Sequence, residues 1–247
     1  MPTTTVYTEN PNSSYFDPPD FRPNMMYFPA RQGVAVKGAV LICPGGAFQF
    51  RSDTEGAPVA IALSELGYQS FVVNYRLRPY SMQEGALDLG RAVRYVRKHA
   101  KDYGIDDKNI AVIGFSAGGI LGGELLLNFD GTVNGTTIDP NYVPDELDKV
   151  SADASAAGMI YSFYGRLSFA STDVEKFMNS NLPPTFFAYG SKDPFVRQFE
   201  LCIEALRQAG VPVEDHVLQD WPHGFGVGDG QWIKYFDHWV TKIFENI

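Results

Sequence analysis

A serine in surroundings typical of a nucleophile lies in the segment GFSAGG at residues 114–119. The segment contains the pattern G-x-S-x-G, follows the apolar run 109–114 and opens the apolar stretch 116–127. A serine in a tight turn between a strand and a helix stands exposed above a sheet, and the flanking glycines give its backbone room. We therefore predict Ser116 as a nucleophile for acyl transfer. The alternative is a serine that only caps a glycine-rich helix.

Two histidines after Ser116 lie where one of them could serve as its base. His216 lies within the predicted strand 212–218, where a half-exposed histidine without a chemical role is the simpler interpretation. His223 lies in the loop after that strand, between a proline and a glycine that favour a turn. Because a loop lets the imidazole reach over the sheet to the serine, we predict His223 as the general base.

An acid that orients the histidine should lie between the serine and the histidine in the chain, just after a strand. Asp193 meets both conditions, because it follows the predicted strand 185–189. The alternative is an aspartate that forms an Asx turn at the start of the next helix. We predict Asp193 as the acid. The weaker candidates, which follow no strand closely or lie too near the histidine, are Asp153, Asp173, Asp215 and Asp220.

A glycine-rich loop, PGGAF at residues 44–48, follows the predicted strand 38–43. Acyl transfer forms an oxyanion, and backbone N–H groups are its usual donors. Two consecutive glycines let the main chain approach a substrate closely and leave amides free to donate. We therefore predict an oxyanion hole in this loop, the alternative being an ordinary turn between a strand and a helix. Bulky side chains follow directly, and we expect Phe48 and Arg51 to contact the substrate.

The elements that would position these groups alternate along the chain. Short apolar runs ended by turn residues predict buried strands, whereas apolar residues at helical spacing predict amphipathic helices. The predicted strands are residues 38–43, 70–75, 109–114, 156–161, 185–189 and 212–218, and the predicted helices are 55–66, 83–103, 116–127, 196–209 and 231–244. Apolar strands separated by helices predict an α/β fold, with a mostly parallel central sheet and helices on both faces.

No linker divides the sequence, so we expect one domain over residues 1–247. Residues 1–23 are rich in Pro, Asn and Tyr and predict an N-terminal arm laid over the surface. Residues 128–155 and 164–184 interrupt the alternation with irregular sequence. Long irregular segments inside an α/β domain usually shape a binding site, and we expect both segments to do so.

Composition and charge limit the classes of function. The 247 residues carry 20 Lys and Arg against 29 Asp and Glu, a formal net charge of −9, with 45% hydrophobic and 20% charged residues. This composition is typical of a soluble globular protein, and the acidic balance argues against a nucleic-acid partner. The one dense basic run, residues 91–101, falls on a predicted helix and predicts a solvent-exposed face.

Two cysteines are too few for a disulfide scaffold, and no Cys/His cluster has the spacing of a zinc site. The N-terminus has no apolar leader segment. No run approaches the roughly 18 apolar residues of a membrane span. We therefore expect no signal peptide, no membrane partner and a cytoplasmic location.

Four segments, in this order and spacing, carry a resemblance: PGGAF, GFSAGG, GSKDPFV and WPHGF. In these segments the chain is similar to the α/β-hydrolase superfamily, and more narrowly to its esterase/lipase branch of hormone-sensitive lipase-like and acetyl xylan esterase-like bacterial carboxylesterases. The resemblance covers nearly the whole chain after about residue 24. It implies the α/β-hydrolase fold and a catalytic triad of Ser116, Asp193 and His223. It also implies an oxyanion hole formed by the amides of Gly46, Ala47 and Ala117.

The chain departs from the family pattern in two places. The family loop often has the sequence His-Gly-Gly-Gly, whereas Pro44 takes the first place here and Ala47 the last. Because this histidine is absent, the substrates of the lipases are a weaker guide to the substrates of this chain. The amide donors stay in place, because alanine also carries an N–H group. Only a short segment precedes the first predicted strand, so we expect no large cap domain.

The residues and the resemblance together predict a serine carboxylesterase for short-chain acyl esters, with acetyl esters of carbohydrates favoured. The absence of a long apolar cap argues against fatty chains. The expected partner is a small-molecule ester, acetylated oligosaccharides included, without a metal or organic cofactor; a homo-oligomer is left open. Two alternatives remain. One is an amide or formamide hydrolase, such as an arylformamidase or a small peptidase, and the other is an inactive hydrolase used as a binding module.

Overall fold

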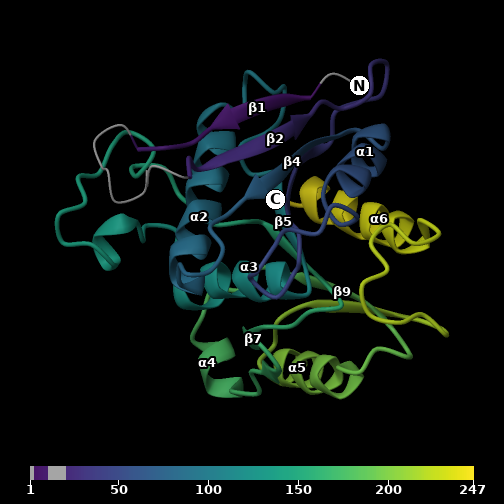
Figure 1. The fold of residues 1–247 in the computed structure, drawn as a ribbon. Coiled ribbons are helices and arrows are strands. Elements are labelled where there is room, and N and C mark those ends of the chain that lie inside the picture. Colours follow the sequence, from purple (N-terminus) through teal and green to yellow (C-terminus); the bar gives the residue numbers. More distant parts are fainter. Residues whose placement is uncertain (1–2, 11–20) are drawn as a thin grey trace.

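The computed structural model describes residues 3–10 and 21–247. The centre of this part of the chain is an eight-stranded sheet with the strand order β1-β2-β4-β3-β5-β6-β9-β10 (Figure 1). The strands from β4 to β10 in that order run parallel, whereas β1 and β2 are antiparallel at one edge. The strands are β1 Thr4–Tyr7, β2 Asn24–Phe28, β3 Gly38–Cys43, β4 Tyr68–Asn74, β5 Ile110–Phe115, β6 Ala156–Ile160, β9 Thr185–Gly190 and β10 Val213–Leu218.

Helices cover both faces of the sheet. Figure 1 shows α1 and α6 on one side of the sheet and α2 and α3 on the other, while α5 packs against β9 and β10. The helices are α1 Ala57–Glu65, α2 Met82–Lys98, α3 Ala117–Asn128, α4 Val174–Met178, α5 Val196–Gln208 and α6 Gln231–Glu245, with a 3-10 helix at Gly135–Thr137. A separate hairpin consists of β7 (Gly165–Arg166) and β8 (Phe169–Ala170). The predicted α/β fold with a mostly parallel, doubly covered sheet is confirmed. None of the helices in residues 3–10 and 21–247 is long and apolar enough to cross a bilayer.

The burial of side chains explains these elements. Every residue of β3, β5, β6 and β9 is buried, as expected for parallel strands covered on both faces. α6 is amphipathic and buries Trp232, Phe236 and Val240. α2 begins at a capping box, in which the Ser81 hydroxyl accepts from the Glu84 amide and the Glu84 carboxylate accepts from the Ser81 amide.

The carboxyl ends of the parallel strands carry the loops that the sequence singled out. The loop 44–48 follows β3, Ser116 follows β5, Asp193 follows β9 and His223 follows β10. Ligands of open α/β sheets bind at this end of the strands. Four separate strands therefore supply the groups of one candidate site.

The prediction of a surface arm over residues 1–23 is wrong for part of the segment. Thr4–Tyr7 forms β1, which pairs antiparallel with β2 and becomes the edge strand of the sheet. Residues 1–2 and 11–20 of the predicted arm lie outside the described residues. β1 has the sequence TTVY and is mostly exposed, so no apolar run marks it as a strand.

The predicted solvent-exposed basic face on α2 is wrong for two of its arginines. Arg91 and Arg94 are only 3% and 0% exposed. Arg91 forms an ion pair of 2.9 Å with Asp145 and donates a hydrogen bond to the Thr8 carbonyl. Arg94 donates to three backbone carbonyl groups of the irregular segment 128–155. These contacts pack the segment on α2.

Candidate active site

Ser116 lies in a strained turn between β5 and α3, with φ 49° and ψ −120°. The glycines of the motif are needed for this turn. A Cβ at Gly118 would lie 2.1 Å from the Cys43 carbonyl oxygen, and a Cβ at Gly114 would lie 2.4 Å from the Gly118 carbonyl oxygen. Ser116 occupies the N-cap position of α3, but its side chain makes no capping hydrogen bond. The alternative of a simple helix cap therefore does not describe this side chain.

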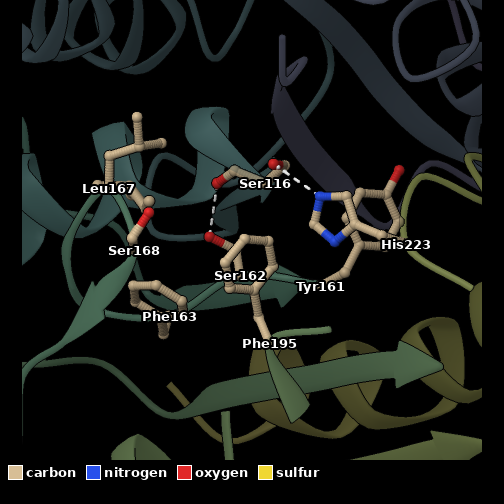
Figure 2. Close-up of a pocket in the computed structure, with 9 residues that line it drawn as sticks. Ser116, Tyr161, Ser162, Phe163, Leu167, Ser168, Phe195 and His223 are labelled. Atoms are coloured by element: carbon tan, nitrogen blue, oxygen red, sulfur yellow. Dashed lines mark hydrogen bonds between the residues drawn. The ribbon is translucent and has the colours of Figure 1, made fainter. Parts of the chain in front are cut away.

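A continuous chain of hydrogen bonds links Ser116, His223 and Asp193. The Ser116 hydroxyl oxygen lies 2.9 Å from Nε2 of His223 (Figure 2). Nδ1 of the same ring lies 2.6 Å from Oδ2 of Asp193, whose side chain is fully buried. The other carboxylate oxygen accepts a hydrogen bond of 2.8 Å from the Phe195 amide. Asp193 thus forms the Asx turn that the sequence offered as an alternative role. It also contacts the histidine.

The loop that carries His223 packs directly on the loop that carries Asp193. The Lys192 amide donates a hydrogen bond of 3.0 Å to the Trp221 carbonyl. A Cβ at Gly190, the last residue of β9, would lie 2.0 Å from that same carbonyl oxygen. Only glycine permits this approach, so the close packing of the two loops sets the separation of Asp193 and His223.

His216 lies outside this arrangement. Its Nε2 lies 2.9 Å from Oε1 of Glu214, and its ring stacks on Tyr235 with 4.3 Å between centroids. The side chain is half-buried on β10. The structure thus brings His223, and not His216, to the serine.

The loop after β3 closely approaches the serine. A Cβ at Gly45 would lie 3.0 Å from the Ser116 Cβ. Gly46 and Ala47 have φ values of 126° and 53°, in the region that L-residues rarely adopt. Within the part of the chain that the structure describes, no hydrogen-bond partner engages the amides of Gly46, Ala47 and Ala117. These donors remain available next to the serine.

A small cavity of about 30 Å³ lies beside Ser116 and His223 (Figure 2). Apolar side chains form most of its wall. The lining residues are Ser116, Ile120, Tyr161, Ser162, Phe163, Leu167, Ser168, Phe195 and His223. Of the two irregular segments, 164–184 contributes to this lining and 128–155 does not.

The two residues expected to contact the substrate do not line this cavity. Phe48 is buried, and its carbonyl accepts a hydrogen bond from the Arg78 amide. Nη1 of Arg51 donates a hydrogen bond of 2.8 Å to the Tyr75 carbonyl, and burial lowers the pKa of this guanidinium. Both contacts tie the glycine-rich loop to the segment after β4.

The sequence predictions gave neither Glu55 nor Tyr161 a role in the catalytic chemistry. The Glu55 side chain accepts hydrogen bonds from the Gly45 amide at 2.6 Å and from the Tyr161 hydroxyl at 2.7 Å. The Tyr161 ring meets the His223 imidazole edge-on, with 4.9 Å between centroids. A single acidic residue before an apolar helix looks like a charge at a helix N-terminus, so the sequence alone carried no distinct signal.

The cysteines and the metal-binding residue types add no reactive centre to the described residues. Burial raises the pKa of both the Cys43 and Cys202 thiols, which keeps them protonated near neutral pH. Residues 3–10 and 21–247 contain no group of three or more His, Cys, Asp and Glu arranged to hold a metal ion.

Comparison with protein families assigns this sequence to a known family. The model of the BD-FAE family matches residues 25–175, more than half of the chain. The chain belongs to the BD-FAE family. The matched region includes the glycine-rich loop and Ser116 but ends before Asp193 and His223.

The BD-FAE chain is similar to two curated bacterial proteins at 27% identity each. One is an acetylxylan esterase from Xylanibacter ruminicola, matched over 218 residues that cover 83% of this chain and 44% of that protein. The other is endo-1,4-beta-xylanase B from Butyrivibrio fibrisolvens, matched over 248 residues that cover 89% of this chain and 36% of that protein. The chain thus spans less than half the length of these curated relatives.

Two solved structures share the fold over nearly their whole length. An acetyl ester-xyloside bifunctional hydrolase from Caldicellulosiruptor lactoaceticus is 29% identical with a TM-score of 0.78, and the match covers 98% of this chain and 96% of that one. The esterase Est2 from Thermogutta terrifontis is 20% identical with a TM-score of 0.75, covering 98% and 92% of the two chains. The predicted resemblance to the esterase branch of the α/β-hydrolases is confirmed.

Proposed function

We propose that the protein is a serine carboxylesterase whose triad is Ser116, His223 and Asp193. The observation that carries the proposal is the unbroken hydrogen-bond chain from the Ser116 hydroxyl through both ring nitrogens of His223 to the buried Asp193 carboxylate. This chain contains a nucleophile, a base that contacts it and a third group that orients the base. Membership in the BD-FAE family and similarity to esterases support the same reaction class.

The reaction follows from these contacts. Nε2 of His223 takes the Ser116 proton while the serine oxygen bonds to the ester carbonyl carbon. The tetrahedral oxyanion collapses as His223 gives that proton to the departing alcohol, leaving an acyl-serine. Water then attacks the acyl-serine while the same nitrogen takes its proton. The second tetrahedral intermediate collapses as His223 returns that proton to the Ser116 oxygen, which releases the carboxylic acid and restores the free serine. Asp193 fixes the imidazole tautomer and stabilises the imidazolium.

Backbone amides would stabilise the oxyanion. The donors in this proposal are Gly46, Ala47 and Ala117, whose N–H groups are not engaged elsewhere in the described chain. A preorganised donor in a site that excludes water contributes about 3 kcal/mol to the transition state. The positive φ values at Gly46 and Ala47 support a loop held in an unusual conformation for this purpose.

The size of the cavity supports a short acyl group. Its volume of about 30 Å³ has room for roughly one or two water-sized groups. Ile120, Phe163, Leu167 and Phe195 give it an apolar wall. An acetyl or propionyl methyl group suits this space, whereas an octanoyl chain would have to displace the wall.

A larger groove beside the cavity supports a polar alcohol. This groove, of about 510 Å³, is lined by Glu124 of α3, which lies one helical turn after Ile120 of the cavity wall. The β7–β8 hairpin likewise gives Leu167 to the cavity and Phe169 to the groove. The Phe169 side chain is 74% exposed. An exposed ring among charged and amide groups suits a carbohydrate, because the ring covers an apolar sugar face and the polar groups bond hydroxyls.

The proposal is tested by kcat/KM on p-nitrophenyl acetate, butyrate, octanoate and laurate, alongside acetate release from acetylated xylo-oligosaccharides. Acetate or butyrate should be preferred, and the oligosaccharides should release acetate. Preference for octanoate or laurate would contradict the short-acyl assignment. Fast cleavage of the acetate ester without release from any sugar would retain the esterase and remove the carbohydrate. Faster turnover of N-formylkynurenine than of every ester would favour the formamide hydrolase instead.

A further inference from the structure

Glu55 is a buried carboxylate between Gly45 and Tyr161 that the proposed reaction does not use. It is 5% exposed, and its oxygens each accept one short hydrogen bond. Oε2 accepts from the Gly45 amide at 2.6 Å and Oε1 accepts from the Tyr161 hydroxyl at 2.7 Å. Burial raises the pKa of Glu55, while both hydrogen bonds and the charge of His223 act in the opposite direction. The Gly45 amide and the Tyr161 hydroxyl each donate to one carboxylate oxygen, and these hydrogen bonds offset the cost of burying the carboxylate.

The hydrogen bond to Gly45 connects Glu55 to the glycine-rich loop at residues 44–48. We call this segment the oxyanion loop, because it carries two of the proposed oxyanion donors. Gly45 directly precedes the proposed donors Gly46 and Ala47. A Cβ at Gly45 would lie 2.9 Å from Oε2 of Glu55 and 3.0 Å from the Ser116 Cβ. The carboxylate therefore holds the loop at a residue whose backbone passes close to the serine.

The hydrogen bond to Tyr161 connects Glu55 to the loop that carries His223, the proposed base. The Tyr161 hydroxyl donates to Glu55 and accepts a hydrogen bond of 3.1 Å from the Gly226 amide. Gly226 lies three residues after His223, and Figure 2 shows Tyr161 directly beside that imidazole. The Tyr161 backbone has φ 38°, an uncommon conformation for a residue other than glycine. Such outliers persist only where the surroundings hold them.

We propose that Glu55 is a positioning residue that, through Gly45 and Tyr161, holds the oxyanion loop and the His223 loop in one fixed arrangement. This inference rests on the proposed esterase function. Glu55 lines no part of the cavity and does not touch the reacting atoms. Loss of one partner in a buried network leaves the others unpaired, so the two loops would shift relative to Ser116. Small displacements of groups that act in the transition state lower kcat more than they raise KM.

The test uses Glu55→Gln and Tyr161→Phe, with p-nitrophenyl acetate as substrate. A glutamine cannot accept from both donors at once, because one of its terminal atoms is itself a donor. Tyr161→Phe keeps the ring against His223 and removes only the hydroxyl. We expect kcat to fall about ten- to hundredfold in each variant, with KM changed less than about threefold. The double variant should lose little more than the worse single variant, because both act through one network.

Tyr164→Phe is the matched control. Tyr164 is also fully buried, and its hydroxyl bonds to Thr185 away from the cavity. A merely structural role for the Tyr161 hydroxyl predicts equal losses of melting temperature and equal, small losses of kcat in the two Tyr→Phe variants. The positioning role predicts similar melting temperatures but a lower kcat for Tyr161→Phe alone.

The outcomes separate this inference from the proposed function. A wild-type protein that neither turns over esters nor reacts with a fluorophosphonate would overturn the esterase and the inference with it. An active wild type with unchanged kcat in folded Tyr161→Phe would overturn the positioning role alone. If Glu55→Gln does not fold, the Tyr161→Phe result decides by itself.

Discussion

Nε2 of His223 lies 2.9 Å from the hydroxyl oxygen of Ser116, although 107 positions separate the two residues in the chain. The two residues follow different strands, which are not neighbours in the sheet. Ser116 stands on the turn after β5, whereas His223 comes from the loop after β10, three strands away in the sheet. The His223 loop packs on the Asp193 loop at Gly190, and this packing holds the His223 imidazole within reach of both Asp193 and Ser116.

Ser116→Ala should fold normally and lose ester hydrolysis by about 10⁴- to 10⁶-fold, because the members of a triad act as a unit. The Ser116 side chain makes no capping bond, so its removal should leave the melting temperature nearly unchanged. The measurements are kcat on p-nitrophenyl acetate and labelling by a fluorophosphonate. Turnover or labelling close to wild type in this variant would refute the assigned nucleophile.

His223→Ala should abolish hydrolysis, whereas His216→Ala should retain it, because only His223 contacts the serine. The wild-type rate should also fall on acidification, since an imidazolium cannot accept the serine proton. A pH–rate profile and the two variants measure this. Loss of activity in His216→Ala with retention in His223→Ala would mean that the base was assigned to the wrong histidine.

Asp193→Asn should separate the two roles of this side chain. The asparagine can still accept from the Phe195 amide, so the Asx turn and the stability should persist. It no longer fixes the required imidazole tautomer, so kcat should fall about 10²- to 10⁴-fold. Asp193→Ala should show the same loss of kcat and, in addition, a lower melting temperature. Equal melting temperatures for the two variants would argue that the turn contributes no stability.

The motifs and the main elements were predictable from the sequence because their signals are local. The apolar runs predicted β3 and β9 to within one residue, and the three groups Ser116, Asp193 and His223 each followed a predicted strand as expected. The geometry brings them together, and their catalytic roles stay predictions. Contacts that depend on packing between distant segments carried no local signal. Examples are the antiparallel β1 edge strand and the carboxylate of Glu55, 106 positions from the tyrosine that it binds.

Arg91→Met should destabilise the protein by about 3 to 5 kcal/mol, because it leaves the charge of Asp145 without its buried partner. Activity per folded molecule should not change, since the pair lies away from the cavity. Urea denaturation measures the difference. Arg197→Met is the control, because Arg197 pairs with Glu200 at the surface and its loss should cost under about 1 kcal/mol. Equal effects in the two variants would show that burial of the pair is unimportant.

Asp145 should make the stability depend on pH in a defined direction. Burial alone would raise its pKa, but the hydrogen bonds and charge of Arg91 hold the pKa below its usual range. A lowered pKa in the folded state contributes stability above about pH 4, the value for an unfolded aspartate, and this contribution is lost as the pH falls further. The stability difference between wild type and Asp145→Asn should therefore shrink below about pH 4. A difference that stays constant down to pH 2 would contradict the coupling.

Leu167→Ala should widen the acyl preference, because Leu167 forms part of the apolar wall of a cavity of only about 30 Å³. The side chain is already 40% exposed, so its truncation should cost little stability. Removal of the side chain relieves the clash with longer chains and weakens the fit to an acetyl group. The ratio of kcat/KM for p-nitrophenyl hexanoate to that for the acetate should therefore rise about three- to tenfold. Leu182→Ala, a half-buried leucine outside the lining, should leave the ratio unchanged. An unchanged ratio in Leu167→Ala would mean that the acyl group does not occupy this cavity.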